Sequence, residues 1–385
     1  AECEKIKGSK NLNVPPLRFP EFTEEWKAEQ LDNIATLSKG IGISKEQLSE
    51  DGEPCILYGE LYTKYKSEII KQVESKTDIN GSKLKRSKAN DVIIPCSGET
   101  AVDIATARCV PFDNILFGGD LNVISLHQYD GAFMSYQLNG KRKYDIARVA
   151  QGVSIVHLYG EHLKAIKTYN PTLPEQQKIA KLLSLLDDRI DTQNKIIEKL
   201  QSLIKGIAQH CIKESTSGNT YVKLGDICQI TTGKLDANAQ VDNGIYPFFT
   251  CAEQPFKIDS FAFDTEALLI SGNGANLGYI NYYKGKFNAY QRTYVLDLFS
   301  ENIQYIKWAL KVLLPKRIAI EKSSSNTPYI VLSTLTDLRL PIPCKSKQSF
   351  IANLMQSLER KLSNQIAQYD SYNYLKQYLL RQMFI

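Results

Sequence analysis

Residues 173–214 carry a repeating pattern of apolar positions that predicts one long helix. Pro174 and Glu175 open the segment, which places proline and an acidic side chain in the first turn, where a helix favours both. Apolar residues then recur at alternating steps of four and three, the heptad spacing of a coiled-coil seam. The seam positions are Ile179, Leu183, Leu186, Ile190, Gln193, Ile197, Leu200, Ile204, Ile207 and Cys211. Such a helix would be about 55–60 Å long and needs a second helix to cover its seam.

A second seam follows the first at a constant offset of 172 residues. Its positions are Ile351, Met355, Leu358, Leu362, Gln365, Tyr369, Tyr372, Lys376, Leu379 and Met383. At this offset Gln365 corresponds to Gln193. Lys376 corresponds to Ile204, so the second seam is less apolar than the first. The alternative is two unrelated amphipathic helices, each packed on its own domain. The shared register and the matched glutamine favour two helices that pair, and short connections require them to be antiparallel.

The segments before the two helices repeat each other as well. Residues 31–40 match residues 224–233 at an offset of 193, and residues 91–98 match residues 266–273 at an offset of 175. The first copy is therefore 18 residues longer, and the basic stretch 64–88 holds most of the difference. Short strand patterns, many aromatic residues and Gly/Asn/Ser turns predict a mixed α/β (α+β) fold for both copies.

These patterns divide the chain into five parts. We expect an N-terminal arm at 1–20, a first domain at 21–172 and a central long helix at 173–214. A second domain follows at 215–343, and a distal long helix at 344–385. Three prolines in the arm exclude a helix there. The chain is thus predicted to be one unit written twice, a domain followed by a helix.

Composition narrows the class of protein. The chain has 385 residues, too many for one core, with 43% hydrophobic and 23% charged residues. Its net charge of +5 permits a polyanionic partner without requiring one. The eight cysteines form no Cys-x-x-Cys pair, which favours free thiols. Residues 1–10 lack an apolar signal segment, and no apolar run reaches membrane-spanning length, so we expect a cytoplasmic bacterial protein without membrane contact.

No catalytic or metal site is expected. The chain has no P-loop, and Gly272–Gly278 resembles a dinucleotide loop but has three residues where that motif has two. The Asn/Asp-Pro-Pro-Tyr/Phe signature of adenine methyltransferases is absent. His157 and His162 are five residues apart, which suits neither a helical zinc pair nor a catalytic triad. Asp187, Asp188 and Asp191 are expected to form a solvated helix face.

Polar and basic loops follow the predicted strands at corresponding places in both copies. Their Ser, Thr, Asn, Lys and Arg side chains are the types that bind phosphates and read base edges. The candidate DNA contacts in the first copy are Ser38, Lys39, Gly40, Ser97, Gly98, Thr100, Arg142, Lys143 and Ser154. Those in the second copy are Thr232, Lys234, Ser271, Asn273, Asn276, Arg292, Lys322, Ser324, Ser325 and Thr327. Any one such loop could be an ordinary solvated turn, but their recurrence favours a shared role.

The layout resembles the specificity subunit of type I restriction–modification systems over essentially the whole chain. The most specific stretch is Leu173-Pro-Glu-Gln-Gln-Lys-Ile-Ala-Lys-Leu-Leu-Ser-Leu-Leu-Asp187, which resembles the opening of the family's central helix. Residues 14–22 with Trp26 resemble its N-terminal arm, and Ser154-Ile-Val-His-Leu158 resembles the close of a recognition domain. The second helix departs from this pattern, because Ser346-Lys347-Gln348 replaces Pro-Glu-Gln at its start.

The resemblance implies a non-catalytic subunit that reads double-stranded DNA. Each domain would read one half of a split, asymmetric target, and the two helices would set the distance between the halves. The chain would bind two methyltransferase subunits, which use S-adenosylmethionine, and two motor–nuclease subunits, which use ATP and magnesium; it would bind no cofactor itself. The seam residues named above would hold the helices and the partners together. The alternatives are a coiled-coil adaptor whose end domains bind a ligand other than DNA, and a subunit of a methylation-only system.

Overall fold

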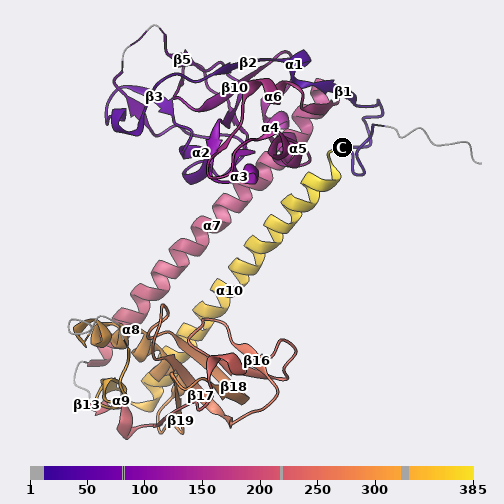
Figure 1. The fold of residues 1–385 in the computed structure, drawn as a ribbon. Coiled ribbons are helices and arrows are strands. Elements are labelled where there is room, and N and C mark those ends of the chain that lie inside the picture. Colours follow the sequence, from indigo (N-terminus) through magenta and orange to yellow (C-terminus); the bar gives the residue numbers. More distant parts are fainter. Residues whose placement is uncertain (1–12, 80, 82, 217–219, 322–328) are drawn as a thin grey trace, which may run out of the picture. The chain divides into compact units, whose positions relative to one another are not determined.

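The two long helices organise the structure. A computed structural model describes residues 13–79, 81, 83–216, 220–321 and 329–385. The chain forms two compact units, Ala1–Asn194 with Gln368–Ile385 and Lys195–Ala367. Helices α7 (Leu173–Thr216) and α10 (Lys345–Gln382) each contribute one end to each unit (Figure 1). The fold is mixed helix and strand with two repeated domains and a long helix between them, which confirms the predicted fold class.

The first unit is built on a four-stranded antiparallel sheet in the order β2-β10-β6-β8. These strands are β2 (Ala35–Lys39), β6 (Asp91–Pro95), β8 (Arg108–Val110) and β10 (Leu121–Leu126). A smaller sheet, in the order β4-β3-β9-β5, contains β3 (Glu53–Ile56), β4 (Lys76–Thr77), β5 (Lys85–Arg86) and β9 (Leu116–Phe117). Two strand pairs join β1 (Lys27–Gln30) to β12 (Lys167–Asn170) and β7 (Ser97–Gly98) to β11 (Val156–His157). The helices are α1 (Leu31–Ile34), α2 (Glu60–Thr63), α3 (Ala101–Ile104), α4 (Gly131–Asn139), α5 (Lys143–Val149) and α6 (Gly160–Lys164).

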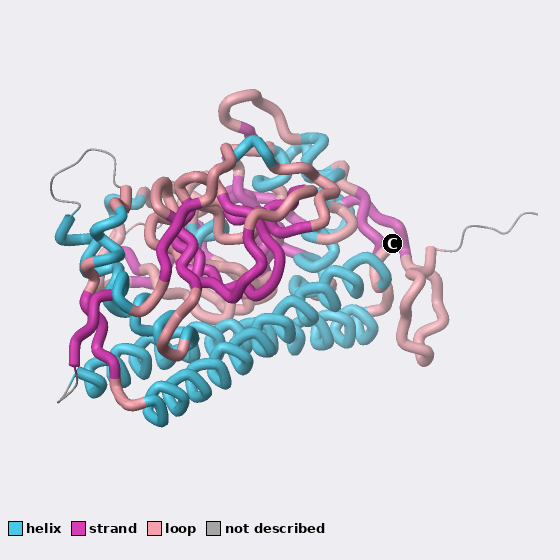
Figure 2. The backbone as a smooth tube through the Cα atoms, turned by 90° about the horizontal axis from the view of Figure 1, so that it is seen from below, coloured by secondary structure: helices cyan, strands magenta, loops and turns pink. Residues whose placement is uncertain are grey.

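The second unit has one six-stranded sheet in the order β14-β19-β17-β18-β15-β16. Its strands are β14 (Gln229–Thr232), β15 (Tyr246–Phe249), β16 (Phe256–Ile258), β17 (Phe263–Ser271), β18 (Ile280–Ala289) and β19 (Thr293–Asp297). Strand β13 (Thr220–Lys223) pairs with β20 (Arg339–Ile342), as β1 pairs with β12. Helices α8 (Ile303–Glu321) and α9 (Leu332–Thr336) correspond to α4 and α6. Figure 2 shows the helices in cyan and the strands in magenta.

The strand orders reproduce the repeat seen in the sequence. The order β2-β10-β6-β8 corresponds to β14-β19-β17-β18. Even a parallel pairing recurs, because Cys55 opposite Leu116 in the first unit corresponds to Phe248 opposite Asn288 in the second. The long strand β18 covers the positions of both β8 and β9, which explains why two sheets in one copy become a single sheet in the other.

Each long helix docks on its own domain through a buried glutamine. Gln176 donates to the carbonyl of Pro171 at 2.8 Å and accepts from the main-chain N–H of Asp130 at 2.9 Å. Gln348 donates to the carbonyl of Pro343 at 2.9 Å and accepts from Asn302 at 3.0 Å. The docking is therefore the same in both copies, although Ser346-Lys347 replaces Pro-Glu before the second glutamine.

The predicted seams face each other within each unit. In the first unit Ile179, Leu183 and Leu186 share a core with Leu379 and Met383. In the second, Leu200 and Ile204 share a core with Ile351 and Met355, and Leu358 and Leu362 are partly buried against it. Ile197 is buried, whereas Ile190 and Tyr369 are half-buried. In each unit, then, the end of one helix packs with the start of the other.

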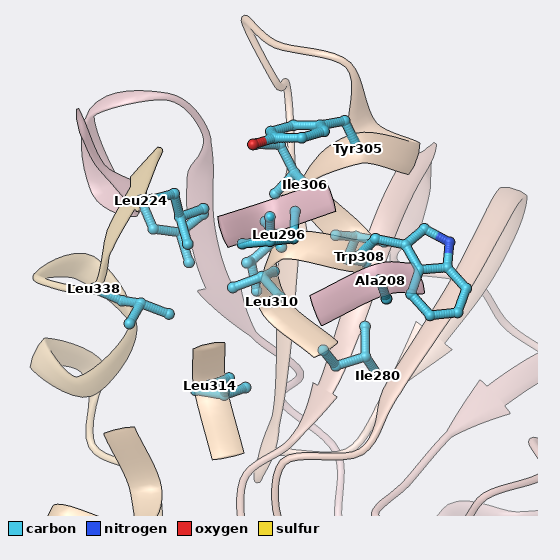
Figure 3. Close-up of a cluster of buried hydrophobic side chains, with 14 of the residues drawn as sticks. Ala208, Leu224, Ile280, Leu296, Tyr305, Ile306, Trp308, Leu310, Leu314 and Leu338 are labelled. Carbon is cyan, nitrogen blue, oxygen red and sulfur yellow. The ribbon is translucent and has the colours of Figure 1, made fainter. Parts of the chain in front are cut away.

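The second core shows how the long helix is fixed to the domain. Ala208 of α7 belongs to one core with Ile306, Leu310 and Leu314 of α8 and with Leu296 of the sheet (Figure 3). The Tyr305 hydroxyl donates to the carbonyl of Pro341 at 2.6 Å, so this large buried ring leaves no polar atom unpaired. The core thus joins helix, sheet and long helix into one packed body.

Candidate nucleic-acid interface

The candidate loops of the first unit meet at one edge of its main sheet. Strands β2 and β6 are both antiparallel to β10, so they run in the same direction and end beside the start of β10. Lys39 ends β2 and Gly40 follows it, and the Gly40 N–H donates to the carbonyl of Leu121 at 2.9 Å. Gly98, just after β6, pairs with Val156, close in sequence to Ser154. The segments Ser38–Gly40, Ser97–Thr100 and the loop of Ser154 therefore gather at this loop edge.

The second unit has the corresponding edge. Strands β14 and β17 are both antiparallel to β19, and Arg292 directly precedes β19. Thr232–Lys234 and Ser271–Asn276 thus come together with Arg292. Asn273 bridges to Tyr329, as Gly98 pairs with Val156 in the first unit.

A glycine is required at the same place in both edges. A Cβ atom on Gly40 would lie 1.9 Å from the carbonyl oxygen of Gly118, and one on Gly233 would lie 1.9 Å from that of Ala289. No side chain fits either position. Gly40 therefore shapes the edge through its main chain and does not offer a side-chain contact.

The predicted contacts differ in what they leave available for a ligand. Lys39, Thr100, Ser154, Thr232, Lys234 and Arg292 are exposed, and Ser97, Gly98, Asn273 and Asn276 are half-buried. Asn276 donates to the carbonyl of Cys251, and Asn273 accepts from its thiol, so these amides also hold the loop together. Ser271 is only 2% exposed and the Ser38 hydroxyl is buried without a partner, which corrects their assignment as direct contacts.

Arg142 and Lys143 do not belong to the loop edge. Arg142 pairs with Asp145 at 3.1 Å, donates to the main-chain oxygen of Ile385 at 3.1 Å and lies over the Tyr169 ring. Lys143 lines a separate pocket beside the end of α10. The sequence pattern suggested base readers here because the Lys-Arg-Lys run is basic, but these internal contacts correct that interpretation for Arg142. Lys322, Ser324, Ser325 and Thr327 lie outside the described residues.

A cleft of about 720 Å³ opens at the loop edge of the first unit. Tyr58 and Tyr62 line it together with Ser97, Glu99 and Ser154. The sequence pattern predicted the loop that contains Glu99 but did not include Glu99 among the contacts. It missed both tyrosines, because Tyr58 precedes α2 and Tyr62 lies within it, in a segment that has no loop signature. The exposed aromatic faces and hydroxyls of this cleft suit contact with bases.

A buried ion cluster ties the first domain to both long helices. Lys376 of α10 binds Glu68 at 2.6 Å and Asp187 of α7 at 2.7 Å, and the Tyr136 hydroxyl donates to Asp187 at 2.6 Å. Burial alone would lower the pKa of Lys376, but the two carboxylates outweigh it and the pKa is raised, so the lysine stays charged. Asp187 is therefore a buried partner, which corrects its expected place on a solvated face.

The other two acids of the predicted helix face and the cysteines form no metal site in the part of the chain that the structure describes. Asp188 and Asp191 lie on an open helix face and pair with Lys71. The seven cysteines that the structure describes are free thiols, and no group of side chains in the described parts could hold a metal ion. No helix among the described residues is long and apolar enough to cross a membrane.

Comparison with known proteins decides the family. The model of the type I restriction modification DNA specificity domain matches the chain twice, at residues 23–202 and 216–369. This chain belongs to that family. The two matches coincide with the two repeated copies, so the specificity domain occurs once in each.

Curated relatives of the specificity family support the assignment. The specificity subunit of the type I restriction enzyme EcoDI from Escherichia coli is 44% identical over 137 residues, which are 36% of this chain and 30% of that protein. The MjaIX specificity subunit from Methanocaldococcus jannaschii is 25% identical, over 56% of this chain and 59% of its own length. The chain thus matches less than two thirds of either relative. The MjaVIII specificity subunit of the same organism is 23% identical over 92% of this chain and 89% of its own length.

The fold of the specificity family extends over the whole chain. The S subunit of a type I system from M. genitalium superposes with a TM-score of 0.68 at 20% identity, covering 97% of this chain and 99% of that one. A chain from a type I complex whose assembly and conformational transition were studied gives 0.58 at 17% identity, covering 96% and 99%. At these identities the likeness establishes the fold alone.

Proposed function

We propose that this chain is the sequence-specific DNA-binding specificity subunit of a type I restriction–modification complex, and that it reads a bipartite, asymmetric target. Each unit would read one half of the target through its loop edge. The observation that carries the proposal is that one edge is built twice, on corresponding strands, from different side chains.

The differences between the edges support an asymmetric target. Arg292 precedes β19 in the second unit, whereas Asp120 takes the corresponding place before β10 in the first. An arginine can bind guanine through O6 and N7, but an aspartate can only accept a hydrogen bond. Two edges with opposite charge at one position would prefer different bases.

We further propose that the long helices scaffold the methyltransferase subunits. In the first unit, Leu185 of α7 and Tyr374 and Tyr378 of α10 leave apolar side chains exposed. In the second unit, Leu203 lines a shallow groove along α7 together with Gly206 and His210. Exposed apolar side chains along a helix are typical of surfaces that pack against partner helices.

The chemistry would belong to the partners. Two methyltransferase subunits would supply S-adenosylmethionine and two motor–nuclease subunits would use ATP and magnesium, with this chain binding no cofactor and catalysing no step. A methylation-only complex would require the same features of this chain, and an adaptor that binds another ligand would not need two diverged loop edges.

Methylome sequencing of cells with and without this gene tests the proposal. We expect methylated adenines within one split, asymmetric sequence in cells that carry the gene, and loss of that methylation on deletion. An unchanged methylome in a strain that expresses the methyltransferase subunits would refute a role in target specificity.

A further inference from the structure

The cleft at the loop edge of the first unit, called here the edge cleft, contains a carboxylate with no internal partner. Glu99 lines this cleft and is exposed to solvent. It forms no hydrogen bond or ion pair with any residue that the structure describes. Asp103, which also lines the cleft, accepts a hydrogen bond from the Thr100 hydroxyl at 2.6 Å and is occupied in that way. Glu99 is therefore the acceptor left available to a ligand.

The main chain on either side of Glu99 is held in place. The Ser97 carbonyl accepts a hydrogen bond from the Tyr62 hydroxyl at 3.0 Å, and Gly98 pairs with Val156 of β11. On the other side, Thr100 caps α3 by accepting from the N–H of Asp103 at 3.1 Å. These contacts fix the position of the Glu99 main chain, so less backbone freedom is lost when its side chain binds.

The edge cleft is unsuited to phosphate. Among the described residues, the one cation in its lining is Arg108, which is buried and donates to the carbonyls of Tyr65 and Ala107. Glu99 and Asp103 would both repel a phosphate oxygen. If this edge faces DNA, Glu99 must therefore meet the base edges and not the backbone.

Only one base suits a carboxylate in the major groove. An ionised glutamate accepts hydrogen bonds and donates none. Guanine presents the acceptors O6 and N7, thymine presents O4, and adenine places its acceptor N7 beside its amino group. Cytosine alone presents an amino donor, N4, with no acceptor of its own base on the major-groove edge. We propose that Glu99 accepts a hydrogen bond from a cytosine amino group and requires a C·G pair at one position of the half-site read by the first unit. This inference rests on the proposed function.

The second unit lacks the corresponding carboxylate. Gly274 occupies the position of Glu99 at the offset of 175, with a φ of +79° that side chains rarely adopt. Gly278, with a φ of +82°, occupies the position of Asp103. The nearby amides of Asn273 and Asn276 are bonded to Cys251. The cytosine requirement therefore belongs to one half-site only.

The test compares wild-type and Glu99→Gln chains in the assembled methyltransferase. Each complex is given a duplex library in which one base pair of the target is varied at a time, and methylation rates are measured. A glutamine amide can donate as well as accept, so it tolerates bases that repel a carboxylate. We expect discrimination for C·G at one position of one half-site to fall by about 5- to 150-fold, the range of one base contact, with the other half-site unchanged.

The control is Glu50→Gln, the same charge change at an exposed residue of the same unit that does not line the edge cleft. It should leave the preference at every position unchanged. Unaltered base requirements in Glu99→Gln, or an equal loss for all targets in a folded and assembled complex, would overturn the assignment. So would a wild-type half-site without any C·G pair, an outcome that needs no variant to fold. A wild-type complex that methylates without sequence preference would instead refute the proposed function.

Discussion

Individual residues carry information that the heptad pattern hides. In the sequence, Lys376 interrupts the second apolar seam, and Asp187 is predicted to be one of three acidic residues on a solvated helix face. In the structure they bind each other, with Glu68 and Tyr136 completing the cluster. A buried ion pair adds little net stability compared with apolar packing, but breaking it strands a charge. The cluster therefore fixes which part of α10 packs against the first domain.

Replacing Lys376 by methionine should destabilise the first unit. Glu68 and Asp187 would remain buried without a cation, which costs about 3–5 kcal/mol for a broken buried pair. The loss should shrink as the pH falls, because burial raises the pKa of the Asp187 carboxyl, which then takes up a proton and is no longer a stranded charge. It should also shrink at high pH, because the lysine of the unfolded chain loses its proton above about pH 10.4. The folded wild-type lysine has a raised pKa and keeps its charge to higher pH, so its stabilising contribution disappears as the pH rises through that raised pKa. Urea unfolding followed by circular dichroism from pH 5 to 11 measures both limbs.

Lys181→Met is the matched control for this experiment, because Lys181 is exposed on α7 in the same unit. Its free energy of unfolding should stay within about 0.5 kcal/mol of wild type. An equal effect of both substitutions would show that the cluster does not stabilise the fold.

Two arginines that look alike in the sequence should behave differently. Arg292 is exposed at the loop edge, so Arg292→Ala should weaken binding by about 1–3 kcal/mol if it reads a base, and only for the second half-site. Arg142→Ala should instead lower stability, because its guanidinium binds Asp145 and the main chain of Ile385. Affinities of the assembled methyltransferase for duplexes with either half-site altered, together with melting temperatures, separate the two effects. A loss of DNA affinity without a loss of stability in Arg142→Ala would return that residue to the interface.

At the scale of elements, hydrogen bonds at the starts of the helices, together with the apolar seam, position the long helices on their domains. Asp130 caps α4 by accepting from the N–H of Phe133, and Asn302 caps α8 by accepting from that of Tyr305. The main-chain N–H of each cap residue donates to Gln176 or Gln348 of a long helix. One local device thus places a short helix and a long helix together in both units.

A charged side chain introduced into the apolar seam should lower stability at a buried position and have little effect at the exposed position next to it. Ile197 is 8% exposed, whereas its neighbour Ile196 is 41% exposed. Ile197→Asp would bury an unpaired charge and should cost several kcal/mol, with loss of solubility or of methyltransferase assembly. Ile196→Asp should be nearly neutral for the free energy of unfolding. Co-purification with the methyltransferase subunits and thermal unfolding measure both; normal assembly of Ile197→Asp would contradict the role assigned to the seam.

At the scale of the whole molecule, two copies of one unit have diverged where they would meet DNA and have kept what joins sheet to helix. The glycines of the loop edges and the docking glutamines recur in both copies. By contrast, Glu99 of the first copy corresponds to Gly274 of the second, and Asp120 corresponds to Arg292. A scaffold kept constant under variable loops is the arrangement expected of a specificity subunit.

Lengthening both long helices should change the target spacer and leave the half-sites unchanged. One heptad inserted after Asn194 in α7 and one after Ala367 in α10 falls between the two units and preserves the seam register. Each insertion adds about 10 Å of helix, or about three base-pair rises of 3.4 Å. Methylome sequencing should show the same half-site bases with a longer spacer. Inserting two residues into each helix rotates the seam by about 200° and should abolish methylation. An unchanged spacer after the heptad insertion would exclude the helices as the ruler.

The sequence by itself determined the elements that depend on periodicity. The heptads predicted both long helices, since an apolar seam repeats at a spacing that only a helix brings to one face. The offsets of 193, 175 and 172 predicted the two copies, and strands with the same order occur at those offsets. The loop segments were also found, because Gly, Ser and Asn mark strand ends wherever the sheet lies.

Only the tertiary structure decided which side chains are available to a ligand. Ser271, Ser38 and Arg142 are residue types that commonly contact DNA. In the structure, however, the hydroxyls of both serines are buried and Arg142 binds partners within the chain. Glu99 and Tyr62 come from different segments and share a cleft only after β6 and α2 have been placed. The sequence shows which side chains can donate or accept a hydrogen bond. Whether such a side chain is available to a ligand depends on residues distant in the chain that bury it or bind it. The same reason explains Lys376 and Asp187, whose charges are 189 positions apart in the sequence and 2.7 Å apart in the fold.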